Sequence, residues 1–229
     1  LRVNGYIPIP ISLDDYFVDR EKTPLDEDGK PGFESLYALD LDLFNKQLND
    51  LLQGKEVEVP KFNFRTGKRE EHGEKLSLPK NGIILIEGIH GLNPRLATYI
   101  PEKNKFKIYI SALTQLNIDA HNRISTTDTR LIRRMVRDNL YRGNDIFRTF
   151  KLWEGVTKGE EKNIFPYQEE ADIMFDSALV YELSVLKKHA VPLLKQVDNS
   201  SIYYSESKRL LRFLNYFKDI EDEKRIPPN

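Results

Sequence analysis

The sequence predicts an α/β fold in which a mostly parallel sheet is flanked by helices. Short apolar runs without helical periodicity are separated by longer segments whose apolar residues recur at helical spacing. This alternation is typical of parallel sheets, because parallel strands need long crossover connections that are usually helices. With 229 residues the chain is long enough for a substantial core, and we expect a single α/β domain over residues 1–229.

Five apolar runs are the expected strands, and six segments carry a helical pattern. The strands are expected at residues 7–13, 82–88, 106–111, 171–179 and 191–197. The helices are expected at residues 39–53, 114–124, 128–142, 145–154, 181–189 and 205–218. Prolines at positions 8 and 10 weaken the first run as a central strand, because proline cannot donate to the ladder.

Residues 55–79 interrupt this alternation with a predicted β-hairpin. The stretch "KEVEVPKFNF" alternates polar and apolar residues, "RTGKREEHG" is rich in turn formers, and "EKLSLP" alternates again. A hairpin inserted into an α/β fold can be a flap that faces a substrate or a decoration of the surface. The pattern alone leaves both interpretations open.

Composition limits the classes of partner. The 36 acidic and 35 basic residues nearly cancel, so no overall charge favours nucleic acid or a membrane surface. The absence of cysteine excludes disulfides and thiolate zinc sites. The sequence has no apolar run of transmembrane length and no signal peptide, and we expect a cytoplasmic protein. A homo-oligomer remains possible, and the start at Leu1 leads us to expect further N-terminal sequence in a longer parent protein.

The stretch "TRLIRRMVRDNLYRG" at 129–143 concentrates positive charge on a predicted helix. Helical spacing places four arginines on one stripe, namely Arg130, Arg133, Arg134 and Arg137. The opposite side is apolar and is expected to pack, with Leu131, Ile132, Met135, Val136 and Leu140. Arg142 and Gly143 are typical of a helix end. The stripe fits a phosphate-binding lid, a nucleic-acid surface or a solvated face.

Two of the expected strands end in carboxylates. Asp14 and Asp15 follow the first strand, and Glu87 ends the second, before Gly88. Ligands gather at the carboxyl ends of parallel strands, where an acid can accept a proton or hold Mg²⁺. Carboxylates and guanidinium groups together are the parts of a phosphoryl-transfer site. The sequence contains no G-x-x-x-x-G-K-[ST], so we expect the phosphate-cradling loop to precede Leu1.

Several stretches in this order resemble the uridine kinase and phosphoribulokinase family of P-loop kinases, from about Gly5 to about Val197. They are "ISLDDYF", "GFESLYALDLDLF", "VEVPKFNFRTGKRE", "IILIEGIHG", "TTDTRLIRRMVRDNLYRG" and "EEADIMFDSAL". The resemblance implies a P-loop NTPase-like α/β fold with an inserted hairpin over 55–79 and an arginine-rich helical lid over 125–145. The first strand and the P-loop of that fold are missing from this chain.

The resemblance assigns roles on the acceptor side. Asp14 would be the catalytic base for the nucleoside 5′-hydroxyl, and Asp14 and Glu87 would hold Mg²⁺. Glu34 takes the place of a ribose-binding aspartate, and Gly67 stands where a base-contacting histidine is expected. The remaining substrate-binding positions implied are Phe17, Phe62, Phe64 and Ile89.

The same resemblance assigns roles to the lid arginines. Arg130, Arg133 and Arg134 would act in catalysis, and Arg130 would also contact the acceptor. Arg134, Arg137 and Arg142 would bind the phosphates of ATP, so the implied cofactors are ATP and Mg²⁺. His90, directly after the acid-glycine strand, is expected to be structural.

The implied activity is ATP-dependent phosphorylation of a nucleoside 5′-hydroxyl, with uridine or cytidine as the expected acceptor and in-line transfer as the mechanism. The printed chain alone is expected to bind ATP poorly and to be inactive. Two alternatives stay open. One is a kinase like phosphoribulokinase or pantothenate kinase, and the other is a non-catalytic regulatory or binding module that keeps the fold.

Overall fold

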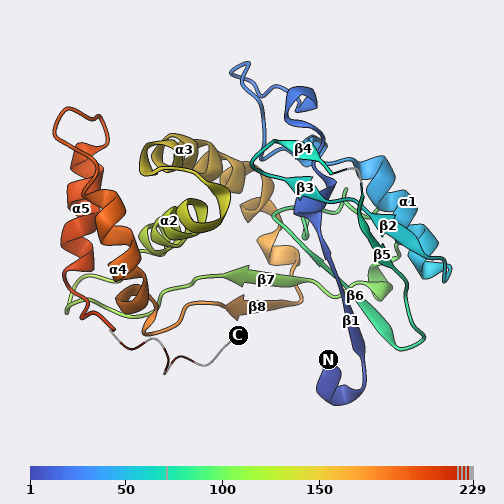
Figure 1. Cartoon of the computed structure of the whole chain (residues 1–229). Coiled ribbons are helices and arrows are strands. Elements are labelled where there is room, and N and C mark those ends of the chain that lie inside the picture. The colour runs from blue at the N-terminus through green and yellow to red at the C-terminus, as the bar shows by residue number, and fades with distance from the viewer. Residues whose placement is uncertain (71, 221, 223, 225, 227–229) are drawn as a thin grey trace. The chain divides into compact units, whose positions relative to one another are not determined.

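The computed structural model describes residues 1–70, 72–220, 222, 224 and 226 (Figure 1). The chain forms two compact units: unit 1 comprises Leu1–Tyr109 and Val156–Ile173, and unit 2 comprises Ile110–Gly155 and Met174–Asn229. Each unit has its own cluster of buried apolar side chains. The prediction of one domain over 1–229 stays a prediction. No helix of the described residues is both long and apolar enough to cross a membrane.

Unit 1 is built on a parallel strand pair. Strands β1 (Ile7–Ser12) and β6 (Gly82–Glu87) run side by side, with Ile7 opposite Gly82 and Ser12 opposite Glu87. Helix α1 (Leu41–Leu52) buries one apolar stripe in the core of the unit, made by Phe44, Leu48 and Leu51. Its first turn is capped by Asp40, whose Oδ1 accepts the Leu43 amide at 3.0 Å.

Two short antiparallel pairs occupy the segment predicted as a hairpin. Strand β2 (Val57–Val59) pairs with β5 (Glu74–Leu76), and β3 (Phe62–Asn63) pairs with β4 (Lys68–Arg69). Val57 and Val59 are buried and Glu58 is exposed, as the period of a strand requires. Antiparallel pairing is therefore confirmed here, although residue 71 lies outside the described part of the chain.

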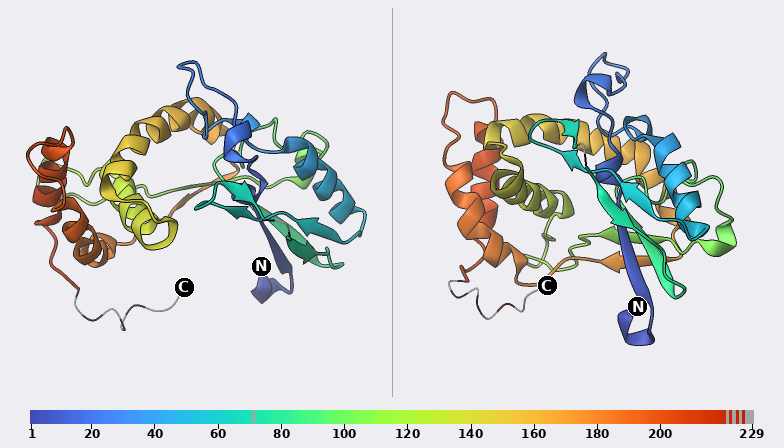
Figure 2. Two further views of the ribbon diagram at one scale, coloured as in Figure 1. Left: turned by 45° about the horizontal axis from the view of Figure 1, so that its top comes forward. Right: turned by 45° about the vertical axis from the view of Figure 1, so that its right-hand side comes forward.

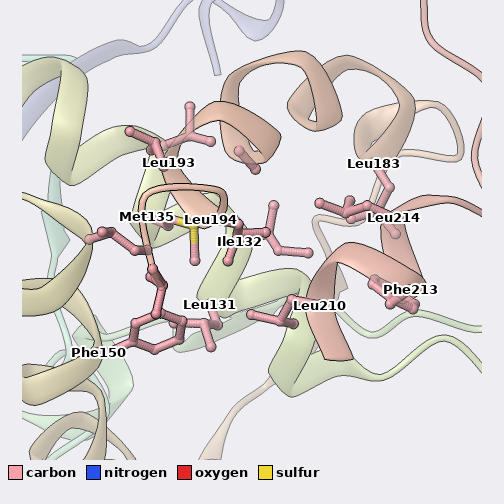
Figure 3. Close-up of a cluster of buried hydrophobic side chains, with 14 of the residues drawn as sticks. Leu131, Ile132, Met135, Phe150, Leu183, Leu193, Leu194, Leu210, Phe213 and Leu214 are labelled. Atoms are coloured by element: carbon pink, nitrogen blue, oxygen red, sulfur yellow. The ribbon is translucent and has the colours of Figure 1, made fainter. Parts of the chain in front are cut away.

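Unit 2 is a helical assembly. Helix α2 (Thr126–Arg137), α4 (Glu182–Leu194) and α5 (Tyr204–Leu214) enclose one apolar cluster (Figure 3). Helices α4 and α5, orange to red in Figure 2, lie side by side and are joined by the Ser207 hydroxyl, which donates to the Leu194 carbonyl at 2.7 Å. Helix α3 (Ile146–Asn163) and the strand pair β7 (Ile108–Ser111) and β8 (Ile173–Asp176) each contain residues of both units.

The predicted single sheet is present only in part. The described strands form four two-stranded sheets, β1–β6, β2–β5, β3–β4 and β7–β8, and β1–β6 is parallel. Fewer strands than predicted are left to join one sheet, because the hairpin strands pair with one another and the run 191–197 is not a strand. The mixed α/β character is confirmed.

The strand predicted at 191–197 is wrong, because α4 continues to Leu194. Ala190, Leu193, Leu194 and Val197 are all buried at the spacing i, i+3, i+4, i+7, so this run packs as a helix. Pro192 lies on the exposed side, where water can bind the carbonyl that its ring leaves without a helical partner.

The helix predicted at 114–124 is also wrong, because this segment forms a tight turn. Ile118 donates its amide to the Asn122 carbonyl at 2.7 Å, and Ile124 donates to Leu116 at 2.9 Å. The Asp119 carboxylate accepts the amides of residues 121 and 122, both at 2.8 Å. Asp and Asn side chains compete with helical hydrogen bonds in this way, and that competition decides the local structure.

Leu140 does not pack on the apolar face where the sequence placed it. Residues Asp138–Arg142 form a π-helical turn after α2, and Leu140 is 52% exposed. A π-turn takes more residues than an α-turn, so it rotates the following side chains away from the α-helical stripe. The other four apolar positions of that stripe are buried, namely Leu131, Ile132, Met135 and Val136.

Replacing Leu131, which is 2% exposed, with alanine should lower the free energy of unfolding by about 2–5 kcal/mol, because it leaves a cavity in the core of unit 2. Leu140→Ala is the matched control, and it should cost less than about 0.5 kcal/mol. Urea unfolding followed by circular dichroism measures both. Equal losses from the two variants would contradict the π-turn register.

Candidate functional site

The parallel pairing of β1 and β6 brings the predicted acids to one end of a sheet. Ser12 and Glu87 are register partners at the carboxyl ends of the two strands, and the Ser12 hydroxyl donates to the Glu87 carboxylate. Asp14 lies two residues beyond β1, in the 3-10 turn Leu13–Tyr16. The structure therefore places Asp14 and Glu87 at the same end of one strand pair, as expected for ligand-binding acids in a parallel sheet.

Gly88 keeps the two strand ends close together. Its φ of 148° is outside the usual range for other residues, and a Cβ at this position would lie 2.7 Å from the Leu13 Cβ. Glycine is therefore required where the turn after β6 packs on the turn after β1.

The carboxylate set is small for a metal site. Within the described residues, no group of three or more His, Asp or Glu side chains is arranged to hold a metal ion. Mg²⁺ commonly binds proteins through one or two carboxylates and keeps several waters and substrate phosphates, so Asp14 and Glu87 fit that mode of binding. Their metal-binding role stays a prediction.

The structure brings together the three predicted aromatic substrate residues. The ring centroids lie 5.7 Å apart for Phe17 and Phe62, 5.3 Å for Phe62 and Phe64, and 6.4 Å for Phe17 and Phe64. The Asp15 carboxylate accepts the Phe62 amide at 3.1 Å, which ties the hairpin to the residue that follows Asp14. We call these three phenylalanines the aromatic trio.

Glu34 belongs to the same unit and is held by the C-terminal part of α3. The Asn163 side chain donates to the Glu34 carbonyl at 2.8 Å. A Cβ on Gly159 would lie 2.5 Å from the Glu34 Cβ, so the helix needs glycine at this contact. Ile89, one residue beyond Gly88, is 37% exposed. The substrate roles of Glu34 and Ile89 stay predictions.

His90 packs inside unit 1. Its side chain is 1% exposed, and neither ring nitrogen makes a hydrogen bond of normal geometry. Burial lowers the pKa of His90 from 6.5 to about 4, although the nearby backbone of Ser35 and Glu34 partly opposes this shift. A neutral, buried imidazole supports the expected structural role.

Arg133 is engaged by its own unit. Its guanidinium donates to both carboxylate oxygens of Glu182 at the start of α4, and the Nη2–Oε2 distance is 2.5 Å. It also donates to the Ser177 carbonyl at 2.7 Å and to the Ser177 hydroxyl at 3.1 Å. In this conformation Arg133 joins α2 to α4, and its catalytic role stays a prediction.

The three arginines assigned to ATP share one buried carboxylate. Asp138 has no exposed side-chain surface, and its oxygens lie 2.8 Å from Arg137, 3.3 Å from Arg134 and 3.9 Å from Arg142. We call Asp138 and these arginines the lid cluster. Asp138 is not among the predicted site residues, although an acid inside a run of arginines is itself a signal of an ion-pair cluster. Arg130 is half-buried on α2.

The predicted site residues thus form two sets. Unit 1 carries the acceptor-side residues, namely Asp14, Phe17, Glu34, Phe62, Phe64, Glu87 and Ile89, and unit 2 carries the arginines, namely Arg130, Arg133, Arg134, Arg137 and Arg142. A model of the phosphoribulokinase and uridine kinase family matches residues 15–184. The chain belongs to this family. The match covers both sets except Asp14, which precedes it by one residue.

Relatives in this family carry the name uridine kinase. One from Staphylococcus epidermidis is 25% identical over 173 residues, covering 75% of each chain. One from Staphylococcus aureus is 24% identical over the same length and coverage. A solved structure described as a possible uridine kinase from Bacillus stearothermophilus covers 76% of this chain and 75% of its own, with 19% identity and a TM-score of 0.45. Kinases of this family use ATP.

His90 should make stability depend on pH. Because its pKa is lower in the folded chain than in the unfolded chain, the unfolded chain binds the extra proton between pH 6.5 and about 4. The free energy of unfolding should therefore fall as the pH drops through that window, by on the order of 2 kcal/mol between pH 7 and pH 5. Urea unfolding at the two pH values measures it. His90→Gln should lose this component and the exposed control His72→Gln should keep it; the opposite result would refute the assignment.

Asp138→Asn should lower the free energy of unfolding by about 1–3 kcal/mol, because it leaves the three guanidinium groups of the lid cluster without their shared counter-charge. The control Asp219→Asn removes an exposed partner of Lys187 and should cost less than about 0.5 kcal/mol. Chemical denaturation compares the two variants. Wild-type stability of Asp138→Asn would show that the cluster does not depend on the carboxylate.

Proposed function

We propose that the chain carries the acceptor-binding and lid parts of an ATP-dependent kinase that phosphorylates the 5′-hydroxyl of a nucleoside, with uridine or cytidine as the acceptor. One observation carries the proposal. The aromatic trio is anchored through Asp15, the residue next to Asp14, and Asp14 shares the end of the β1–β6 pair with Glu87. An aromatic ring and a potential base thus lie within residues 14–17, and Asp15 ties the hairpin that carries the other two rings to that stretch.

Asp14 is the proposed base. It accepts the proton of the 5′-hydroxyl as that oxygen forms a bond to the γ-phosphorus, while the bond from the γ-phosphorus to the bridging oxygen breaks and ADP leaves. Mg²⁺ held by Asp14 and Glu87 would neutralise charge on the phosphates. The lid arginines would stabilise the negative charge that develops on the phosphoryl oxygens.

The aromatic trio favours a planar base over a sugar phosphate as the acceptor. Phenylalanine rings stack on a base but offer no hydroxyl for hydrogen bonding, and Gly67 supplies no side chain where a histidine is expected. Recognition would therefore rest on stacking more than on hydrogen bonds. A kinase acting on a sugar phosphate or pantothenate is the alternative within the same chemistry.

A non-catalytic binding module is a second candidate, and one observation favours it. Arg133, which is assigned to catalysis, is bound by both carboxylate oxygens of Glu182, so its guanidinium is already neutralised within unit 2. A module of this kind would bind a nucleoside without transferring phosphate.

The test is transfer from labelled ATP by the native-length protein to a panel of nucleosides, ribulose 5-phosphate and pantothenate. Asp14→Asn should lower kcat by about 10²–10⁴-fold with little change in the KM for the nucleoside, because the base acts mainly in the transition state. Asp50→Asn, on the surface of α1, is the control and should keep full activity. Wild-type turnover by Asp14→Asn would remove Asp14 as the base. If no acceptor is phosphorylated, the kinase proposal fails and the binding module stands.

A further inference from the structure

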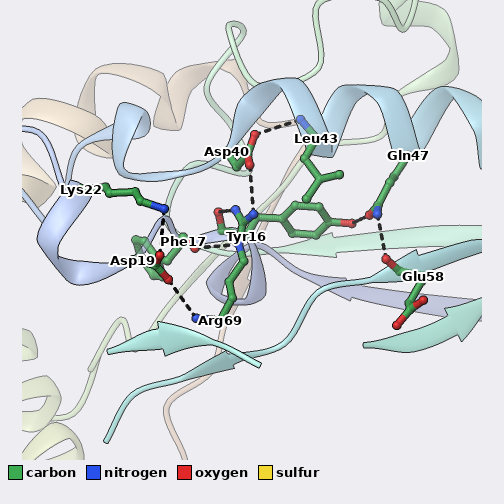
Figure 4. A network of polar contacts seen from close by, with 9 residues as sticks. All are labelled: Tyr16, Phe17, Asp19, Lys22, Asp40, Leu43, Gln47, Glu58 and Arg69. Atoms are coloured by element: carbon green, nitrogen blue, oxygen red, sulfur yellow. Dashed lines mark hydrogen bonds and ion pairs between the residues drawn. The ribbon is translucent and has the colours of Figure 1, made fainter. Parts of the chain in front are cut away.

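Arg69, on β4 of the hairpin, is bonded to more than one segment of unit 1 (Figure 4). Its guanidinium lies 3.0 Å from the Asp40 carboxylate and donates to the carbonyls of Tyr16 and Phe17, each at 3.1 Å. Its backbone amide donates to Asp19 at 3.2 Å. The side chain is 26% exposed, so the bonds are partly shielded from water.

Asp40 connects this arginine to helix α1. One carboxylate oxygen caps the helix at Leu43, and the other binds Arg69. The Asp40 amide also donates to the Tyr16 carbonyl at 2.8 Å, so Tyr16 oxygen accepts from both residues. The Asp40 carboxylate is therefore held in place independently of Arg69, and the guanidinium binds a rigid set of acceptors.

The same segment is tied to β2 by a second route. The Tyr16 hydroxyl donates to the Gln47 side chain at 2.7 Å, and Gln47 donates to the Glu58 carbonyl at 2.8 Å. Figure 4 shows both routes, with the Tyr16 ring and Gln47 to the right of Arg69. Of these two routes, the one through Arg69 reaches the aromatic end of the hairpin, where Asp15 also accepts the Phe62 amide.

Arg69 is the register partner of Phe62 across the β3–β4 pair. That pair contains only two residues per strand, and a ladder this short does not hold its own geometry in water. The Phe17 carbonyl bound by Arg69 belongs to the residue whose ring contacts Phe62 at 5.7 Å. One guanidinium thus fixes the backbone on both sides of the aromatic trio.

We propose that Arg69 is a positioning residue that holds the aromatic trio in the arrangement that binds the planar base of the acceptor. This inference rests on the proposed function. Arginine is required because three separate nitrogens each reach one acceptor, Nε the Phe17 carbonyl, Nη1 the Asp40 carboxylate and Nη2 the Tyr16 carbonyl, whereas lysine has a single nitrogen. Arg69 acts through the phenylalanines and makes no contact with the acceptor.

The experiment compares Arg69→Met, Arg69→Lys and Arg209→Met with the wild-type chain. Arg209 binds Asp128 at 2.7 Å and Glu206 at 2.6 Å, so its loss breaks comparable ion pairs in unit 2. Hydrogen exchange of amides 61–70 reports how firmly the hairpin is held. Isothermal titration with uridine reports binding.

We expect amides 61–70 to exchange at least about tenfold faster in both Arg69 variants. Uridine affinity should fall about 10- to 100-fold, as for a site displaced by about 1 Å. Arg209→Met should alter neither hairpin exchange nor uridine affinity.

Three results would overturn the proposal: unchanged exchange in Arg69→Met, wild-type behaviour of Arg69→Lys, or the same effects in Arg209→Met. The second would mean that charge alone suffices, and the third that general loss of stability is the cause. If the wild-type chain binds no uridine, the proposed acceptor fails. Hydrogen exchange then decides by itself whether Arg69 positions the hairpin.

Discussion

The parallel ladder between β1 and β6 is the constraint on which the acceptor side of unit 1 depends. Because side chains alternate along a strand, a slip of one residue would turn every side chain of β1 to the opposite face. The pairing of Ser12 with Glu87, and the approach of Gly88 to Leu13, both require the observed register. The place of Asp14 is then set by the short turn that follows Ser12. Apolar strand packing thus determines where the acids lie.

Carboxylates organise the regions that the ladder does not reach. Asp40 joins the start of α1 to Arg69, and Asp138 holds the lid cluster of unit 2. Asp128 makes a similar ion pair with Arg209 in unit 2, outside the residues assigned to a site. An ion pair is therefore not in itself a sign of function. What distinguishes Asp40 and Asp138 is that their partners are the hairpin and the arginines assigned to phosphate.

Local patterns predicted most of the local elements, and the errors have local as well as long-range causes. The isoleucine-rich runs at 7–13 and 82–88 are strands, and the alternation at 55–79 gives antiparallel pairs. The run 191–197 is apolar enough for a strand, but residues 191–194 complete α4, and Leu193 and Leu194 are buried in the cluster that α4 shares with α5. The contacts of Arg69 could not be predicted from a local pattern, because Asp40 is 29 residues away in the sequence and Tyr16 is 53 residues away. The motifs that resemble a kinase family predict roles for Asp14 and the trio, whereas no pattern within them points to Arg69.

The arginines of residues 130–142 show why spacing alone cannot assign a role. Helical spacing puts Arg133 and Arg134 on one stripe, yet Arg133 is bound to α4 and Arg134 to the lid cluster. In that cluster one negative charge faces three positive charges, so an excess of positive charge remains for an anion. Since Asp138 already restrains the guanidinium groups, an arriving phosphate would lose less affinity to side-chain ordering than at three independent arginines. The buried acid is therefore compatible with the proposed phosphate binding.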